Sequence, residues 1–211
     1  MKYSDGRPVE IAFLIEISSK FLQMFLNEKG RTSVKNDGLM PSALSGPVLD
    51  FLMPKITLLG NGGAIWILAA LIPLCTKKYR RQGILLLVGL IAGVLVGNAC
   101  LKNLIARPRP CWLDSSVQLL IANLADYSFP SGHTLSSVIG ATGLTKTNRR
   151  FGYAAIPLAA LIAFSRLYLY VHFPSDVLAA AVLGVALGEL VWRCGGKLLE
   201  RWHAPRGRQR A

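Results

Sequence analysis

The stretch GILLLVGLIAGVLVGNACL, residues 83–101, decides the fold of this chain. It holds no charged side chain, and only Asn98 near its end is strongly polar. Since a helix rises about 1.5 Å per residue, the stretch is long enough to cross the roughly 30 Å hydrocarbon core of a bilayer. It therefore predicts a transmembrane helix that ends at Lys102.

Four more apolar runs lie on either side of it. Ile65–Cys75 precedes it, and Phe151–Tyr170 and Val177–Trp192 follow it at lengths close to that of a spanning helix. Thr134–Leu144 is shorter and rich in Ser, Gly and Thr, small residues that let membrane helices approach closely. Extended to 131–148, this run also predicts a spanning helix.

The N-terminal part of the chain is less regular. Ile11–Leu26 is apolar but contains Glu16 and Lys20, so it is either a marginal span or an interfacial amphipathic helix. Gly30–Gly46 is predicted to be a loop, and Val48–Leu59 a short or interfacial helix. The expected fold class is therefore all-α, a polytopic membrane helical bundle with five or six transmembrane helices.

Composition separates two classes of basic protein. The formal net charge of +13 alone would suit a nucleic-acid binder, yet 52% of the residues are apolar and only 17% are charged. Soluble domains usually hold roughly 25% charged residues. The Lys and Arg residues also sit in short clusters between the apolar runs, which is typical of a membrane protein. We therefore expect no nucleic-acid partner.

The basic clusters predict an orientation. Lys77–Arg81, Lys146–Arg150 and the tail from Arg193 to Arg210 fall on one side of the membrane by helix order, and the positive-inside rule makes that side cytoplasmic. We expect a multi-pass protein of the cell (inner) membrane whose polar helix ends face the extracytoplasmic side. Those ends are Lys102–Pro110, Tyr127–His133 and Ser165–Asp176.

Three motifs occupy these outward-facing ends. They are Lys102-x6-Arg109-Pro110, Pro130-Ser131-Gly132-His133 and Ser165-Arg166-x5-His172-x3-Asp176. Lys102, Arg109 and Arg166 supply cations that can neutralise the oxygens of a phosphoryl group, and arginine can do so in a bidentate fork. Ser131 and Gly132 are predicted to open a helix whose free N–H groups favour an anion, and glycine lets the backbone come close to it.

Two histidines divide into two chemical roles. His172 precedes Asp176 by four residues, and Pro174 suits the first turn of a helix. The carboxylate can then hold one ring nitrogen while the other attacks phosphorus. His133, beside the anion site, can protonate the departing oxygen as a general acid. No acidic cluster suggests a divalent metal, so we expect metal-independent chemistry without a cofactor.

These motifs resemble the three signature motifs of the type-2 phosphatidic acid phosphatase superfamily, in order and at the family's spacing. The resemblance covers Gly60–Val191 and implies a helical bundle with its active site at the outer membrane face. It also implies that His172 is the nucleophile and forms a phosphohistidine, that Asp176 is its partner and that His133 is the acid. The implied phosphate-binding residues are Lys102, Arg109, Ser131, Gly132 and Arg166.

By resemblance to short bacterial members of this family, we expect an integral membrane lipid phosphatase. Its substrate is expected to be undecaprenyl diphosphate, phosphatidylglycerol phosphate or phosphatidate. Two alternatives remain open: a lipid phosphotransferase that uses the same site, and a non-catalytic membrane lipid-binding protein. The sequence leaves the lipid, the headgroup and the oligomeric state undetermined.

The chain is expected to divide into three parts. An N-terminal helix and loop cover 1–46, a membrane phosphatase domain covers 47–199, and a basic cytoplasmic tail covers 200–211. Two polar residues stay outside the motifs. Asn98 could either hydrogen-bond between helices or support the site, and Arg107 is interpreted as an interfacial side chain.

Overall fold

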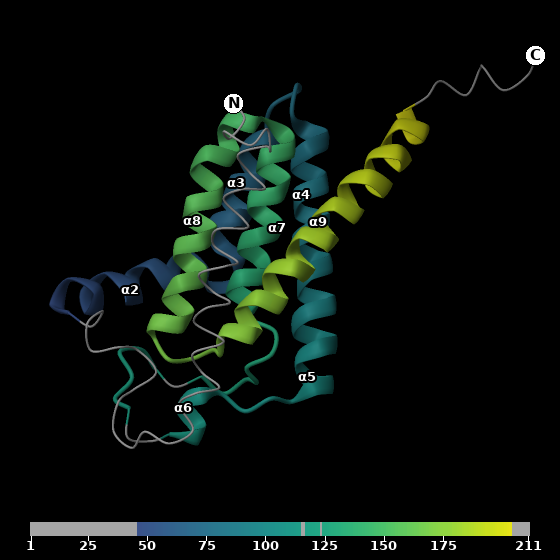
Figure 1. Ribbon diagram of the computed structural model, residues 1–211. Helices are drawn as coiled ribbons and strands as arrows, with labels where there is room; N and C mark the ends of the chain where they lie inside the picture. Colours follow the sequence, from purple (N-terminus) through teal and green to yellow (C-terminus); the bar gives the residue numbers. More distant parts are fainter. Residues whose placement is uncertain (1–45, 115–116, 123, 204–211) are drawn as a thin grey trace, which may run out of the picture.

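The computed structural model describes residues 46–114, 117–122 and 124–203, which form helices and loops without a strand. Long helices stand side by side, and short elements gather at one end of the bundle (Figure 1). The elements in chain order are α2 (Pro47–Leu59), η1 (Asn61–Gly63), α3 (Ala64–Leu74), α4 (Arg80–Gly93), the π-helix η2 (Val94–Leu101), α5 (Lys102–Ile105), α6 (Pro110–Leu113), α7 (Gly132–Thr147), α8 (Arg149–Tyr168) and α9 (Pro174–His203).

The described residues contain three candidate membrane spans, or up to four, whereas five or six were expected for the whole chain. The described segments long and apolar enough to cross a membrane are Arg80–Leu113, Arg149–Tyr168 and Pro174–Leu198. The pair formed by α2 and the segment Asn61–Leu74, bent by 45°, adds a fourth if it is one broken span. α7, expected to span, has only 16 residues, and Ile11–Leu26 lies outside the described residues.

The position of α7 explains why it is short. It packs against α3, α4, α8 and α9, and its buried Leu135 and Ile139 belong to the main apolar core. Glycine permits this close packing, since a Cβ on Gly140 would lie 2.4 Å from Cε3 of Trp66. Because protein surrounds it on several sides, α7 does not need the length of a lipid-facing span.

The outside of the bundle is apolar. Large side chains such as Ile72, Leu104 and Val182 are exposed, as expected for a surface that contacts lipid acyl chains.

The two ends of the bundle differ in charge. The α3–α4 and α7–α8 turns, which carry Lys77–Arg81 and Lys146–Arg150, lie at the same end as the C-terminal end of α9 (Figure 1). The elements α5 and α6 lie at the opposite end.

Candidate active site

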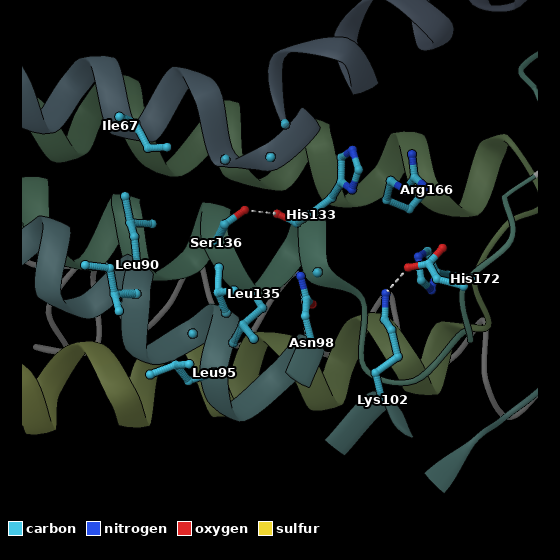
Figure 2. Close-up of a pocket in the computed structure, with 18 of the residues that line it drawn as sticks. Ile67, Leu90, Leu95, Asn98, Lys102, His133, Leu135, Ser136, Arg166 and His172 are labelled. Carbon is cyan, nitrogen blue, oxygen red and sulfur yellow. Dashed lines mark hydrogen bonds and ion pairs between the residues drawn. The ribbon is translucent and has the colours of Figure 1, made fainter. Parts of the chain in front are cut away.

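Six of the eight predicted site residues line one cavity of about 420 Å³, and the other two, Ser131 and Asp176, do not. The charged and imidazole side chains that line its polar end are Lys102, Arg109, Asp126, His133, Arg166 and His172. Its other end is lined by apolar side chains of α3, α4 and η2, among them Ile67, Leu90 and Leu95 (Figure 2). A phosphate group and a lipid chain would each find a matching surface in this one space.

His172 lies in the short loop between α8 and α9 and is buried. Its Nδ1 is 3.6 Å from Asp176 Oδ2, and its Nε2 is 3.3 Å from Arg109 Nη1. Because a guanidinium only donates, Nε2 holds its lone pair and the ring proton is on Nδ1, facing the carboxylate. Burial lowers the pKa of His172 to about 4, although Asp176 opposes the shift. The neutral ring therefore presents a nucleophilic Nε2.

Asp176, in the first turn of α9, is fully buried and accepts three hydrogen bonds besides its contact with the imidazole. The donors are the Ser128 hydroxyl, the backbone N–H of Phe173 at 2.9 Å and Arg107 Nη1 at 2.7 Å. Arg107 is thus an ion-pair partner of Asp176 rather than an interfacial side chain. Its place depends on Ala106, whose positive φ of 47° turns the chain back after α5, a turn that sequence reasoning missed.

The three predicted phosphate-binding cations are all buried, with exposed fractions of 7% for Lys102, 1% for Arg109 and 2% for Arg166. Arg166 donates from Nη1 to Thr57 Oγ1 at 2.6 Å, and its Nε has no hydrogen-bond partner among the described residues. A buried N–H without an acceptor is costly, so an oxygen from a bound anion would be stabilised there.

Asp126, in the loop between α6 and α7, was not singled out from the sequence. Its carboxylate contacts Lys102 Nζ at 2.5 Å and Arg109 Nη2 at 2.6 Å. Burial opposes ionisation, but the hydrogen bond from Lys102 and the two positive charges lower the pKa of Asp126 to about 2. The side chain is 54% exposed. The Asp126 carboxylate thus forms ion pairs with two of the three cations, Lys102 and Arg109.

We expect Asp126→Asn to strengthen the binding of phosphate-like anions. Without the carboxylate, orthovanadate no longer competes with a negative charge for Lys102 and Arg109, and its inhibition constant should fall about three- to tenfold. The matched control is Glu189→Gln, which removes a carboxylate that also bridges two cations, Lys146 and Arg193, away from the cavity. A higher inhibition constant in Asp126→Asn would mean that Asp126 supports the cation site instead of competing for it.

Ser131 and Gly132 open helix α7 as expected, but they have different structural roles. The Ser131 hydroxyl accepts from the backbone N–H of Thr134 at 3.5 Å, so it caps the helix, and the side chain is fully buried. Any phosphate contact of Ser131 would have to come from its backbone. Gly132 lines the cavity, and a Cβ there would lie 2.9 Å from Asn98 Oδ1. Glycine is therefore needed for the close approach of η2.

Asn98, which the sequence left either as a link between helices or as a support of the site, lies in the π-helix η2. This rare helix type occurs often at functional sites, and it interrupts the long helix just before the first cation. Asn98 and Lys102 line the same cavity, and Figure 2 shows Asn98 between Lys102 and the apolar side chains Leu90 and Leu95. Asn98 is thus part of the cavity wall, at the boundary between its polar and apolar ends.

A buried imidazole beside three buried cations, in a bundle of lipid-facing helices, is an arrangement that suits the class of membrane phosphatases. Comparison with known proteins agrees with this class. Residues 82–200 match the model of the PAP2 superfamily, and the chain belongs to that family. Its curated relatives include enzymes named as phosphatases, and the protein is a membrane phosphatase of the PAP2 type.

Two relatives illustrate the similarity. The chain is 34% identical over 121 residues to an undecaprenyl-diphosphatase of Sulfolobus acidocaldarius, with 57% of this chain and 58% of that protein covered. It is 30% identical over 146 residues to the undecaprenyl-diphosphatase BcrC of Bacillus subtilis, with 69% and 75% covered. The match thus spans less than two thirds of the archaeal protein and three quarters of the bacterial one.

Two solved structures share the fold. LpxE of Aquifex aeolicus superimposes with a TM-score of 0.64 at 27% identity, covering 72% of this chain and 89% of that one. A transmembrane PAP2-type phosphatidylglycerolphosphate phosphatase of Bacillus subtilis gives a TM-score of 0.60 at 24% identity, covering 87% and 96%. The all-helical membrane architecture expected from the sequence is therefore confirmed.

Proposed function

We propose that this protein hydrolyses a phosphomonoester or diphosphate of a membrane lipid through a phosphohistidine on His172. The observation that carries the proposal is the position of His172 Nε2, 3.3 Å from Arg109 Nη1, at the polar end of a cavity whose other end is apolar. Undecaprenyl diphosphate is the preferred substrate, because two relatives are named undecaprenyl-diphosphatase. Phosphatidylglycerol phosphate and phosphatidate are the other candidates.

In the first step, Nε2 of the nucleophilic histidine attacks phosphorus and the bond from phosphorus to the leaving oxygen breaks. Lys102, Arg109 and Arg166 bind the non-bridging oxygens, where charge must be stabilised. His133, as an imidazolium whose Nε2–H is held by Asn61, gives its Nδ1 proton to the leaving oxygen. Asp176 holds the proton on Nδ1 and stabilises the ring as it becomes positive. The products are a free lipid or lipid monophosphate and the phosphohistidine.

In the second step, water attacks the phosphohistidine and the bond from phosphorus to nitrogen breaks. His133, now without its proton, takes one from the attacking water, which restores both histidines. Inorganic phosphate leaves the three cations. No step requires a metal ion, and among the described residues no group of three His, Cys, Asp or Glu side chains could hold one.

We propose that the site faces the extracytoplasmic side of the inner membrane. Support comes from the basic turns Lys77–Arg81 and Lys146–Arg150, which lie at the end of the bundle opposite α5 and α6. Basic loops remain preferentially on the cytoplasmic side. The proposed phosphatase domain covers 47–199 and the proposed cytoplasmic tail 200–211, while 1–46 lies almost wholly outside the described residues.

The test is phosphate release by the purified protein in detergent with EDTA present, against the three candidate lipids. We expect release from at least one of them, with less than about a twofold effect of EDTA, since the cations of the site are side chains. Transfer of phosphate only to an added lipid acceptor would replace hydrolysis by phosphotransfer. The absence of both reactions for all three lipids would contradict the proposal.

A further inference from the structure

The α2–η1 elbow, residues 57–63, lies outside the part of the chain that matches the family model, yet it reaches the cavity. α2 extends sideways from the bundle beside α8, and the chain then turns into α3 (Figure 1). Gly62 and Gly63 make this turn with φ values of 59° and 71°, in the left-handed region that favours glycine. The segment therefore has a defined backbone next to the site.

Thr57, on α2, contacts one of the three cations of the cavity. It is 2% exposed, and its Oγ1 accepts from Arg166 Nη1 at 2.6 Å across 109 positions of sequence. Thr57 itself does not line the cavity, whereas Arg166 does. A buried guanidinium needs acceptors, and this hydroxyl holds one nitrogen of Arg166 from behind. Nε is left for an oxygen that the described residues do not supply.

Asn61, at the start of η1, contacts His133, the proposed general acid, through a side-chain oxygen as Thr57 contacts Arg166. Its Oδ1 lies 2.8 Å from His133 Nε2, and an amide oxygen only accepts, so this ring nitrogen carries a proton. Gly60 packs against the same ring, since a Cβ there would lie 2.7 Å from His133 Cδ2. Asn61 does not line the cavity, so it holds the imidazole from outside the substrate's space.

We infer that Thr57 and Asn61 are positioning residues of the active site. Thr57 orients Arg166 to bind the phosphoryl group, and Asn61 orients His133 to protonate the leaving oxygen. The inference rests on the proposed function, because it assigns roles through Arg166 and His133. It goes beyond the three motifs, since both groups come from a segment that precedes all of them. The two residues act through different groups, one on phosphate binding and the other on proton transfer, so their effects are separable.

Thr57→Val removes the acceptor at constant volume. The inhibition constant of orthovanadate and the KM of the lipid substrate should each rise about tenfold, because Arg166 loses its orientation. Thr57→Ser keeps a hydroxyl and should recover most of the binding. In an Arg166→Lys background the Thr57→Val change should add less than about twofold, since it acts through the guanidinium.

Asn61→Leu should instead alter how strongly the hydrolysis rate depends on the leaving group of the substrate. Hydrolysis of an alkyl lipid phosphate, whose departing oxygen needs a proton, should slow about tenfold. Hydrolysis of p-nitrophenyl phosphate, a good leaving group, should change by less than about twofold for the same reason. Asn61→Asp keeps an acceptor oxygen and should recover the rate with the alkyl substrate. Orthovanadate inhibition should stay at the wild-type value in Asn61→Leu.

Thr76→Val is the matched control, since Thr76 bonds Pro73 at the opposite end of the bundle and should behave as wild type. Equal losses with every substrate and unchanged orthovanadate inhibition in both variants would make the elbow merely structural and overturn the inference. Wild-type behaviour of both variants would overturn it as well. A wild-type protein that hydrolyses neither substrate would refute the proposed function itself.

Discussion

His172→Ala is expected to abolish turnover, with phosphate release at least about 10⁴-fold below wild type, as when a covalent nucleophile is removed. The other histidine that lines the described cavity, His133, has its Nε2 bonded to Asn61. The phosphoenzyme should disappear with the activity. Labelling with a ³²P-lipid, followed by an alkaline quench that preserves phosphohistidine, measures both effects.

The same variant should keep its fold and its anion site. Asp176 retains its bonds from Ser128, Phe173 and Arg107, so the loss of the imidazole leaves no bare buried carboxylate. Binding of inorganic phosphate should stay within about threefold of wild type, because the three cations remain. Asn103→Ala, an exposed change next to Lys102, should have wild-type activity. Activity of His172→Ala above about 1% would place the nucleophile elsewhere.

Arg109→Ala should have the second largest effect, a fall in kcat/KM of about 10³-fold. Arg109 touches the nucleophile through Nη1 and donates to the Val171 carbonyl at 2.7 Å and to the Asp126 carbonyl at 2.6 Å. Removing it takes away a proposed phosphate-binding charge and leaves three carbonyl groups, those of Asp126, Tyr127 and Val171, without this donor. The hydrolysis rate at low substrate concentration measures the loss.

The comparison with lysine separates charge from geometry. Arg109→Lys restores a positive charge but not the planar fork, so we expect it to remain about 10²-fold below wild type. Arg193→Ala, on an exposed arginine of α9 bonded to Glu189, is the control and should be unaffected. If Arg109→Lys were fully active, the site would use only the charge of Arg109, and the hydrogen bonds seen here would have no catalytic role.

The spacing of the motifs predicted where most of the charged and imidazole side chains of the cavity lie, for a physical reason. Lys102 follows a long apolar run, Gly132 and His133 open a helix, and Arg166 closes another, so each sits at a helix end. Helices that cross the same bilayer bring alternate ends to the same side. A linear pattern of apolar runs was therefore enough to bring these residues together at one end of the bundle.

Residues in irregular loops were not predictable in this way. Asp126 and Ser128 lie in the loop before α7, and neither belongs to a motif. Their contacts, Asp126 with two cations and Ser128 with Asp176, depend on the path of that loop. The left-handed backbone at Ala106, which places Arg107, also had no sequence signal, because alanine rarely adopts it.

The sequence by itself determined a membrane helical bundle, the clustering of its polar helix ends and most of the charged side chains that line one cavity, because hydrophobic length and helix order control these features. Only the tertiary structure decided which groups contact each nitrogen of His172, that Asp126 contacts Lys102 and Arg109, and which side chains contact Arg166 and His133. Those properties depend on hydrogen-bond partners from distant segments, as in the pair of Thr57 and Arg166 across 109 positions. Local pattern cannot specify such partners, because their distance depends on how the helices pack.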